Sequence, residues 1–391
     1  MWKNKAERSI IKTKYGFIKD GGKMAEIRLE NVSMVYEKGN VQALKNIDLD
    51  IKDHEFLVLL GPSGCGKSTM LRIISGLISQ TEGKVFFDGQ DMAGTDARER
   101  NVAMVFQSYA LYPHLNVYKN IAFPLGSIRG MKKEEIAAKV EEVAEILDVT
   151  SILNRRPREL SGGQRQRVAL GRAMVRNPVV FLLDEPLSNL DTKMRAELRD
   201  VIADVHKRLG TTFVYVTHDQ SEAMQLGDRI AVMENGVIRQ VGKPQEVYNC
   251  PNCVYVASFV GSPRMNFFAA RFVKKEDSLA VRIMGHEFPL PEGKVSLEKE
   301  SVKDEGRVIA GIRPEDFKLS AGDPEYDISF PATAEKTVPM GAGLHVEFSL
   351  AGTAFLAVLQ NHTEVNPGDE LCLHVDSRTI HLFDPETEER I

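Results

Sequence analysis

The sequence predicts an α/β domain built on a mainly parallel sheet, followed by a smaller all-β domain. Up to about Pro251, strand-like apolar runs alternate with helical patterns, which is typical of a parallel sheet covered by helices. Beyond about Phe259, short β-prone pieces such as RVIAGI, HVEFSL, TAFLAVL and ELCLHV are separated by Gly, Pro, Asn and Asp. That texture favours a separate, barrel-like β domain.

The strands of the first domain are expected, in chain order, at EIRL, EFLVLL, KVFF, VAMVF, VVFLLD, TFVYVT and RIAVM. Helical patterns begin after Lys67, Lys132, Ser161, Thr192 and Asp219. In the second of these helices, apolar residues recur at the three-four spacing of one buried face, at Ile136, Val140, Val143, Ile146 and Leu147.

Composition excludes several classes of protein. The chain has 27% charged and 43% hydrophobic residues with a net charge of −5, so we expect no nucleic-acid partner held by a broad basic field. No apolar run reaches the roughly 18 residues of a membrane helix. The chain has 4 cysteines and its start lacks the apolar core of a secretory signal, which together favour the cytoplasm. Cys250 and Cys253 have the spacing of half a zinc site, but no second pair follows, so we expect no metal there.

The first chemical motif is GPSGCGKST, which follows the strand EFLVLL and precedes the helical MLRIISGL. Strand, glycine-rich loop and helix in this order are typical of a P-loop, because successive amides at a helix start cradle phosphate oxygens. Lys67 is expected to reach the β and γ phosphates, Ser68 to bind Mg²⁺, and Thr69 to lie near the α phosphate. The predicted ATP-binding residues are Gly61, Pro62, Ser63, Gly64, Cys65, Gly66, Lys67, Ser68 and Thr69. Within this loop, Cys65 is expected to be a small loop residue that is modestly prone to alkylation because it lies beside a helix start.

Two acids end the apolar strand VVFLLDEP. Such a strand brings Asp184 to the metal, and Glu185 beside it is placed to orient or deprotonate the attacking water. Acid pairs at strand ends are also found in plain surface turns, but after a P-loop the catalytic interpretation is favoured.

The stretch LSGGQRQRVALGRA also opens a helix with a serine and two glycines, in the manner of an anion site. Because a complete P-loop already lies upstream, the question is which phosphate this second loop binds. With the P-loop and VVFLLDEP in this order, the chain resembles the nucleotide-binding subunit of an ABC transporter. The resemblance implies an ABC cassette of the P-loop NTPase fold with a helical subdomain. It also implies that two cassettes pack head to tail, so that Ser161, Gly162, Gly163 and Gln164 serve the ATP of a second copy or a close homologue.

Four further residues match the cassette. Gln107 resembles the glutamine that joins Mg²⁺ and water to the surface facing the membrane subunit, and Asp191 the aspartate of the loop at the dimer interface. His218 resembles the switch histidine at the γ phosphate, and Tyr36 the aromatic residue that stacks on adenine. Taken alone, His218 would be a capping residue, Gln107 polar surface and Tyr36 an ordinary strand residue.

The resemblance extends to the second domain through GSPRMNFF and GIRPEDF, which are similar to importers of the maltose and glycerol-phosphate kind. It implies an OB-like (TOBE) domain that joins the subunits and takes regulatory input, although EKTVPMGAGLHVEF is a loose match and leaves a regulatory contact open. The implied domains are residues 24–258 for the ABC nucleotide-binding domain and 259–391 for the OB-like domain. Polyamine and ferric-ion importers stay open as alternatives.

The function implied is an ATPase that powers sugar import from the cytoplasmic face of a bacterial or archaeal membrane. Its cofactors are ATP and Mg²⁺, and its partners are two permease subunits, indirectly a solute-binding protein, and a regulatory protein at the second domain. A DNA-repair or chromosome ABC ATPase would need a long coiled coil between P-loop and signature, and a translation-factor type two cassettes; neither fits this sequence. Before the first strand, residues 1–23 match nothing in the family. A purine-rich stretch encoding Gly21, Gly22 and Lys23 would suit a ribosome site, so we expect Met24 to be the natural start and residues 1–23 to be a non-native or disordered extension.

Overall fold

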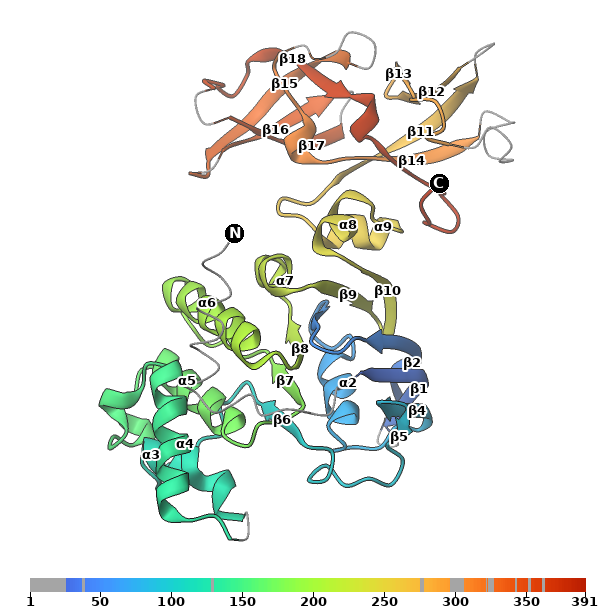
Figure 1. The fold of residues 1–391 in the computed structure, drawn as a ribbon. Helices are drawn as coiled ribbons and strands as arrows, with labels where there is room; N and C mark the ends of the chain where they lie inside the picture. The colour runs from blue at the N-terminus through green and yellow to red at the C-terminus, as the bar shows by residue number, and fades with distance from the viewer. Residues whose placement is uncertain are drawn as a thin grey trace, which may run out of the picture. The chain divides into compact units, whose positions relative to one another are not determined.

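The computed structural model describes residues 26–36, 39–127, 130–274, 278–295, 306–320, 322, 327–341, 343–350, 353–360 and 363–391. The predicted extension at residues 1–23 lies outside this description. The chain divides into two compact units, one up to Gln245 and one from Glu246 (Figure 1). The domain boundary predicted between residues 258 and 259 therefore falls within the second unit.

A four-stranded antiparallel sheet, in the order β2-β1-β4-β5, forms one layer of the first unit. Its strands are β1 (Ile27–Tyr36), β2 (Val41–Ile51), β4 (Glu82–Phe87) and β5 (Gln90–Asp91). EIRL and KVFF thus belong to a separate antiparallel sheet, not to the parallel one. The reason is visible in β2, where buried and exposed residues alternate along its second half as in a sheet with one covered face.

A six-stranded sheet in the order β10-β9-β3-β8-β7-β6 forms the second layer. Its strands are β3 (Phe56–Leu60), β6 (Val102–Val105), β7 (Val180–Asp184), β8 (Thr212–Thr217), β9 (Arg229–Glu234) and β10 (Val237–Gly242). All its pairs are parallel except β9 with β10, which confirms the mainly parallel sheet. Every residue of β3, β7 and β8 is buried. Because these three adjacent strands are parallel, their carboxyl ends lie at one edge of the sheet.

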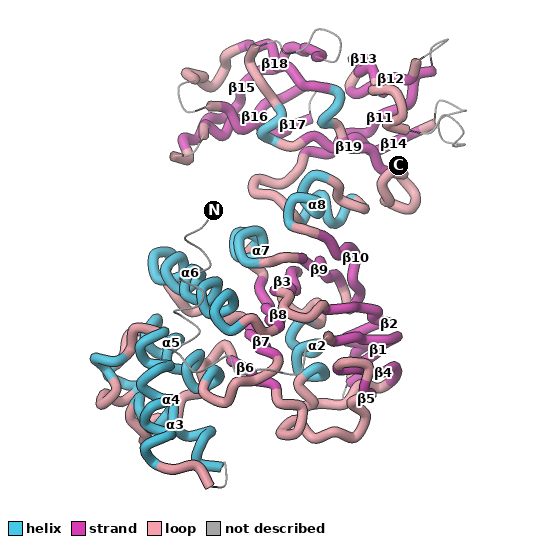
Figure 2. Tube along the Cα trace, in the orientation of Figure 1, coloured by secondary structure: helices cyan, strands magenta, loops and turns pink. Residues whose placement is uncertain are grey.

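Five of the helices described in the first unit begin within one residue of where the sequence predicts them, and α3 is the exception. The helices are α2 (Lys67–Ile74), α3 (Val117–Ala122), α4 (Lys133–Ile146), α5 (Gly162–Met174), α6 (Thr192–Leu209) and α7 (Gln220–Leu226). Ser161, Asp191 and Asp219 each cap the following helix by accepting a backbone N–H, which fixes these starts. Helix α3 was not predicted because six residues are too few to show a helical period. Figure 2 shows α3, α4 and α5 gathered beyond β6, as the predicted helical subdomain.

The second unit is almost entirely β structure, as predicted. After α8 (Pro244–Asn249) and α9 (Val254–Phe259), it forms sheets in the orders β13-β12-β11-β14-β19 and β17-β16-β15-β18. The strands are β11 (Asn266–Lys274), β12 (Leu279–Ile283), β13 (His286–Pro289), β14 (Arg307–Ile312), β15 (Asp327–Pro339), β16 (Leu344–Leu350), β17 (Thr353–Leu359), β18 (Glu370–Asp376) and β19 (His381–Phe383). The two sheets share one hydrophobic core rich in phenylalanine, including Phe317, Phe330, Phe348 and Phe355. Among the described residues, no helix is both long and apolar enough to cross a membrane.

Candidate active site

A pocket of about 610 Å³ opens at the loop between β3 and α2. This volume is within the range of small-molecule sites. Its lining includes six of the nine P-loop residues, but not Gly61, Pro62 or Cys65. The lining residues are Tyr36, Val41, Gln42, Ala43, Lys45, Ser63, Gly64, Gly66, Lys67, Ser68, Thr69, Glu185, Asn235 and Gly236.

The loop adopts a conformation that depends on glycine. Gly66 is the N-cap of α2 with a φ of 106°, and a Cβ there would lie 2.5 Å from the carbonyl oxygen of Ala43. The helix start beyond it carries unpaired amides and the positive end of the helix dipole, which suit phosphate. The ammonium of Lys67 donates to the carbonyl oxygens of Gly61 and Pro62, at 2.8 Å each. The loop therefore holds its own lysine at the pocket.

The predicted reactivity of Cys65 is wrong. The side chain is buried in the core under the P-loop, and that burial raises the pKa of the thiol although the Lys67 ammonium lowers it. A buried, protonated thiol is a poor nucleophile.

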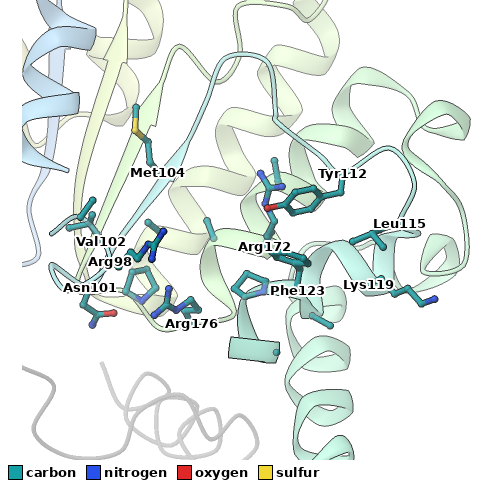
Figure 3. A pocket seen from close by; sticks show the side chains of 18 of the residues that line it. Arg98, Asn101, Val102, Met104, Tyr112, Leu115, Lys119, Phe123, Arg172 and Arg176 are labelled. Carbon is teal, nitrogen blue, oxygen red and sulfur yellow. The ribbon is translucent and has the colours of Figure 1, made fainter. Parts of the chain in front are cut away.

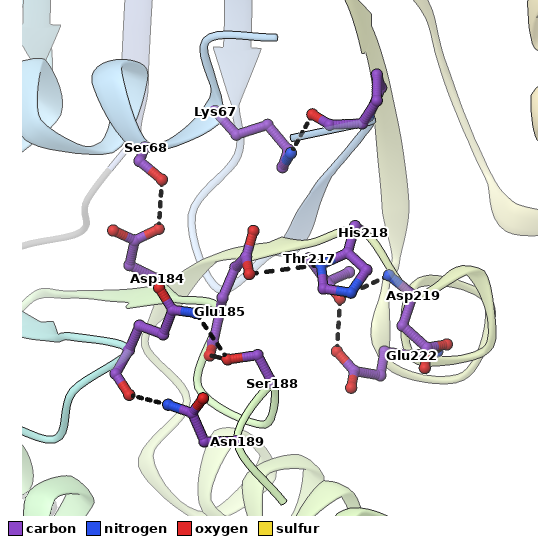
Figure 4. Close-up of polar contacts among 12 residues, drawn as sticks. Lys67, Ser68, Asp184, Glu185, Ser188, Asn189, Thr217, His218, Asp219 and Glu222 are labelled. Atoms are coloured by element: carbon purple, nitrogen blue, oxygen red, sulfur yellow. Dashed lines mark hydrogen bonds and ion pairs between the residues drawn. The ribbon is translucent and has the colours of Figure 1, made fainter. Parts of the chain in front are cut away.

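Ser68 and Asp184 form the oxygen pair at which a magnesium ion is predicted. Ser68 Oγ donates to Asp184 Oδ1 at 2.6 Å (Figure 4), and Asp184 is buried at the end of β7. Mg²⁺ prefers oxygen ligands and is held through one or two carboxylates together with substrate phosphates. The hydroxyl and carboxylate, adjacent to the phosphate loop, fit that ion. The described residues contain no cluster of three or more acidic, His or Cys side chains that would hold it without the substrate.

Glu185 lies beside His218 and is joined to Gln107 through a loop serine, Ser188; Figure 4 labels Glu185, His218 and Ser188. His218 Nδ1 lies 3.4 Å from Glu185 Oε2. Ser188 Oγ donates to the carbonyl oxygen of Glu185 at 2.9 Å, and Gln107 Nε2 lies 3.2 Å from the same hydroxyl. Asn189 donates to the carbonyl oxygen of Gln107 at 3.0 Å, which fastens the two loops a second time.

Glu185 has a left-handed backbone with a φ of 45°, immediately after the strand residue Asp184. Its amide donates to the carbonyl oxygen of Val216 on β8, at 3.1 Å. This change of backbone direction separates the tasks of the two acids: Asp184 faces Ser68, and Glu185 faces His218 and lines the pocket.

The remaining predicted residues fall into two groups. The hydroxyl groups of Tyr36 and Thr69 lie 3.3 Å apart, and both residues line the pocket. The residues Ser161 to Gln164 and Asp191 do not line it. Ser161 and Gln164 bond each other's backbone amides at the start of α5, and Asp191 accepts from Met194 N at the start of α6.

Several polar residues at this site were not predicted. Ser188 and Asn189 open SNLD, the stretch that ends at Asp191 and resembles the loop at the dimer interface, but their bonds to Glu185 and Gln107 were not predicted. Thr217, Tyr215 and Glu222 form a buried network beside His218; the only sequence signal was an acid in the first turn of a helix.

A second hollow, of about 1040 Å³, lies between β6 and the helical subdomain (Figure 3). It combines basic and aromatic side chains, namely Arg98, Tyr112, Lys119, Phe123, Arg172 and Arg176. The Tyr112 and Phe123 rings lie 4.4 Å apart, and Phe123 is 51% exposed. Arg172 donates to the carbonyl oxygens of Ala110 and Tyr109, which ties α5 to the segment that follows Gln107.

Matches to known families follow the two units. The ABC transporter family matches residues 44–188, the MalK OB fold domain 261–317 and the TOBE domain 310–383. Similar solved structures include the dimeric ATP-binding cassette MJ0796 in a post-hydrolysis state with ADP and Pi, at 36% identity and a TM-score of 0.51, covering 56% of this chain and 98% of that one. Another is cbiO1 from Clostridium perfringens, part of the ABC transporter complex cbiONQ, at 28% identity and a TM-score of 0.54, covering 57% and 91%.

Relatives match along their whole length. The chain is 44% identical over 370 residues to the oligosaccharides import ATP-binding protein MsmX of Bacillus subtilis. It is 44% identical over 369 residues to the sn-glycerol-3-phosphate import ATP-binding protein UgpC of Escherichia coli K12. It is 45% identical over 390 residues to the trehalose/maltose import ATP-binding protein MalK of Thermococcus litoralis. Each match covers 94% of this chain and 100% of the relative.

Proposed function

This chain belongs to the family of ATP-binding subunits of ABC transporters, and on that premise we propose that it is the ATPase that powers an importer of sugars or sugar-like solutes. The observation that carries the proposal is the meeting of two pairs at one P-loop pocket: Ser68 with Asp184, and Glu185 with His218. The choice of sugar rests on relatives named for oligosaccharides, glycerol phosphate and trehalose or maltose.

The pocket binds ATP by its phosphates first. The amides at the start of α2 and the ammonium of Lys67 bind the β and γ phosphates. Tyr36, at the rim of the same pocket, stacks on adenine. Mg²⁺, held by Ser68, Asp184 and Gln107, would supply neutralisation of phosphate charge.

Hydrolysis uses the side chains beyond the strand ends. Glu185 accepts a proton from the attacking water, whose oxygen bonds to the γ phosphorus while the bond from that phosphorus to the bridging oxygen breaks. ADP and inorganic phosphate leave. His218 contacts the γ phosphate, and its distance of 3.4 Å from Glu185 supports this shared task.

Two copies, or this chain and a close homologue, share each ATP. Ser161, Gly162, Gly163, Gln164 and Asp191 do not line the pocket of their own chain, which supports a role at the pocket of the partner. The start of α5, like that of α2, is suited to a phosphate. The dimer therefore closes only when the γ phosphate is present, and it opens again after hydrolysis.

The membrane partners are two permease subunits at the cytoplasmic face, where the chain is peripheral. The hollow beside Tyr112 and Phe123 fits an apolar helix with an acidic or polar end, because the exposed Phe123 ring and the half-buried Tyr112 ring lie among arginines (Figure 3). Through Arg172, movement of that segment reaches α5. The solute itself reaches the permeases from a solute-binding protein, and the second unit accepts a regulatory protein.

Purification of the tagged chain from its host membrane tests this proposal. Two hydrophobic membrane proteins should copurify, and proteoliposomes holding the complex should take up a sugar only with ATP inside and the solute-binding protein outside. A Lys67→Ala chain should assemble equally and transport nothing. Recovery without membrane proteins, or ATP-independent uptake, would refute the transporter assignment.

A further inference from the structure

Beside the histidine of the site lies a carboxylate with no assigned task. Glu222, in the first turn of α7, is 3% exposed. Its Oε2 accepts two hydrogen bonds from β8, from the Tyr215 hydroxyl at 2.8 Å and from Thr217 Oγ1 at 2.7 Å. Thr217 directly precedes His218, so one of these bonds reaches the loop that carries the histidine (Figure 4).

The direction of these bonds matters. A threonine hydroxyl has one proton, and that of Thr217 is given to Glu222. Its lone pairs are left to accept, and they accept the backbone amide of Asp219 at 2.9 Å. The Thr217 hydroxyl therefore links the residues on both sides of His218, Thr217 and Asp219, and its hydrogen bond to Glu222 sets its orientation.

The loop needs such a fastening because packing does not hold the ring. The His218 side chain is 52% exposed, whereas Thr217 is 3% exposed. The other anchor is Asp219, whose carboxylate caps α7 and pairs with Arg195 at 3.2 Å. The position of the His218 ring, 3.4 Å from Glu185, follows from the backbone at its two neighbours.

A residue that only filled space at this position would not need a hydrogen-bond acceptor. Burial raises the pKa of Glu222, which reflects the cost of holding a carboxylate away from water. An apolar side chain of similar volume would fill the space beneath α7 without that cost. What an apolar residue cannot supply is an acceptor for the Thr217 proton.

We propose that Glu222 is a positioning residue for ATP hydrolysis: through Thr217 it fixes the loop that holds His218 against Glu185. This inference rests on the proposed function, since it takes His218 to act in hydrolysis. Glu222 itself touches no reacting atom.

The experiment compares the loss of each of the two donors to the same oxygen of Glu222. Tyr215→Phe removes the bond that does not involve the histidine loop. Thr217→Val removes the one that does, together with the bond from the Asp219 amide, so the Glu222 variants below are needed to assign the effect to the carboxylate. Both should lower the melting temperature. Only Thr217→Val should lower kcat, by about 10- to 100-fold as expected when a reacting group is misplaced. Its KM for ATP should stay within about twofold, because the P-loop is untouched, and Thr217→Ser should restore kcat.

A second arm changes the carboxylate. Glu222→Gln keeps an oxygen for both donors and should retain most activity, while Glu222→Met should behave as Thr217→Val does. An equal fall of kcat in Tyr215→Phe, or a normal kcat in Thr217→Val and Glu222→Met, would overturn the inference. His218→Ala serves as reference: if it hydrolyses ATP normally, the assignment of His218 in the proposed function fails, and the inference with it. If His218→Ala is inactive and Thr217→Val is normal, the inference alone fails.

Discussion

Replacing Glu185 by glutamine separates catalysis from folding, because the structure makes the two effects very different in size. Glutamine has the same number of heavy atoms and leaves no cavity. The ion pair with His218, 52% exposed on the histidine side, stabilises the fold by at most about 1 kcal/mol. Loss of a general base lowers kcat by about 10² to 10⁴, or roughly 3 to 5 kcal/mol of transition-state stabilisation. Catalysis should thus fail in a protein that remains folded.

The assay is steady-state hydrolysis together with thermal unfolding and size exclusion in ATP. Glu185→Gln should melt within a few degrees of the wild type, bind ATP, and elute as a dimer that the wild type forms only transiently. Lys67→Ala is the contrast, since it should lose ATP binding and form no such dimer. Normal turnover by Glu185→Gln would show that another group activates the water. A large fall in melting temperature would show that the loss of activity came from unfolding.

Three further outcomes are expected. Ser161→Ala should abolish most hydrolysis but leave ATP binding by the isolated subunit intact, and an equal loss of binding would contradict the shared site. N-ethylmaleimide should modify exposed Cys372 much faster than Cys65, as peptide mass spectrometry would measure; equal rates would contradict the burial of that thiol. Burial raises the pKa of Asp316 from 3.8 to about 6. The folded protein therefore holds this proton more tightly than the unfolded chain, and the contribution of Asp316 to the free energy of unfolding falls as the pH rises from about 4 to about 6. Asp316→Asn should remove that slope, and its melting temperature relative to wild type should rise over this window, whereas a constant difference would refute the assignment.

The sequence predicted best those features that depend on neighbouring residues. The P-loop follows from a strand, glycines and a helix in one stretch, and the starts of α5 and α7 follow from Ser161 and Asp219, which cap them locally. The contact between Asp184 and Ser68 could also be predicted, because parallel strands end at one edge of a sheet: Asp184 ends β7, and Ser68 follows the loop after β3.

Features that depend on burial or on distant partners could not be predicted from the sequence. Cys65 was judged by its place beside a helix start, but the core beneath the loop decides its pKa. Ser188 joins the site through its hydrogen bond with Gln107, which is 81 residues away in the sequence. Likewise, an acid in the first turn of a helix is usually an exposed partner of the helix dipole, and only the fold reveals that Glu222 is buried against β8.

The bonds that Lys67 makes inside its own loop have a consequence for ligand selectivity. An arriving molecule must offer the ammonium more than the two carbonyl oxygens of Gly61 and Pro62 already provide. Phosphate oxygens do so, because bonds between two charged groups are stronger than those to a neutral carbonyl. Adenosine has no phosphate to exchange for them, even where its base stacks on Tyr36 as proposed. In the proposed site, Lys67 would therefore distinguish a nucleotide from a nucleoside independently of the base.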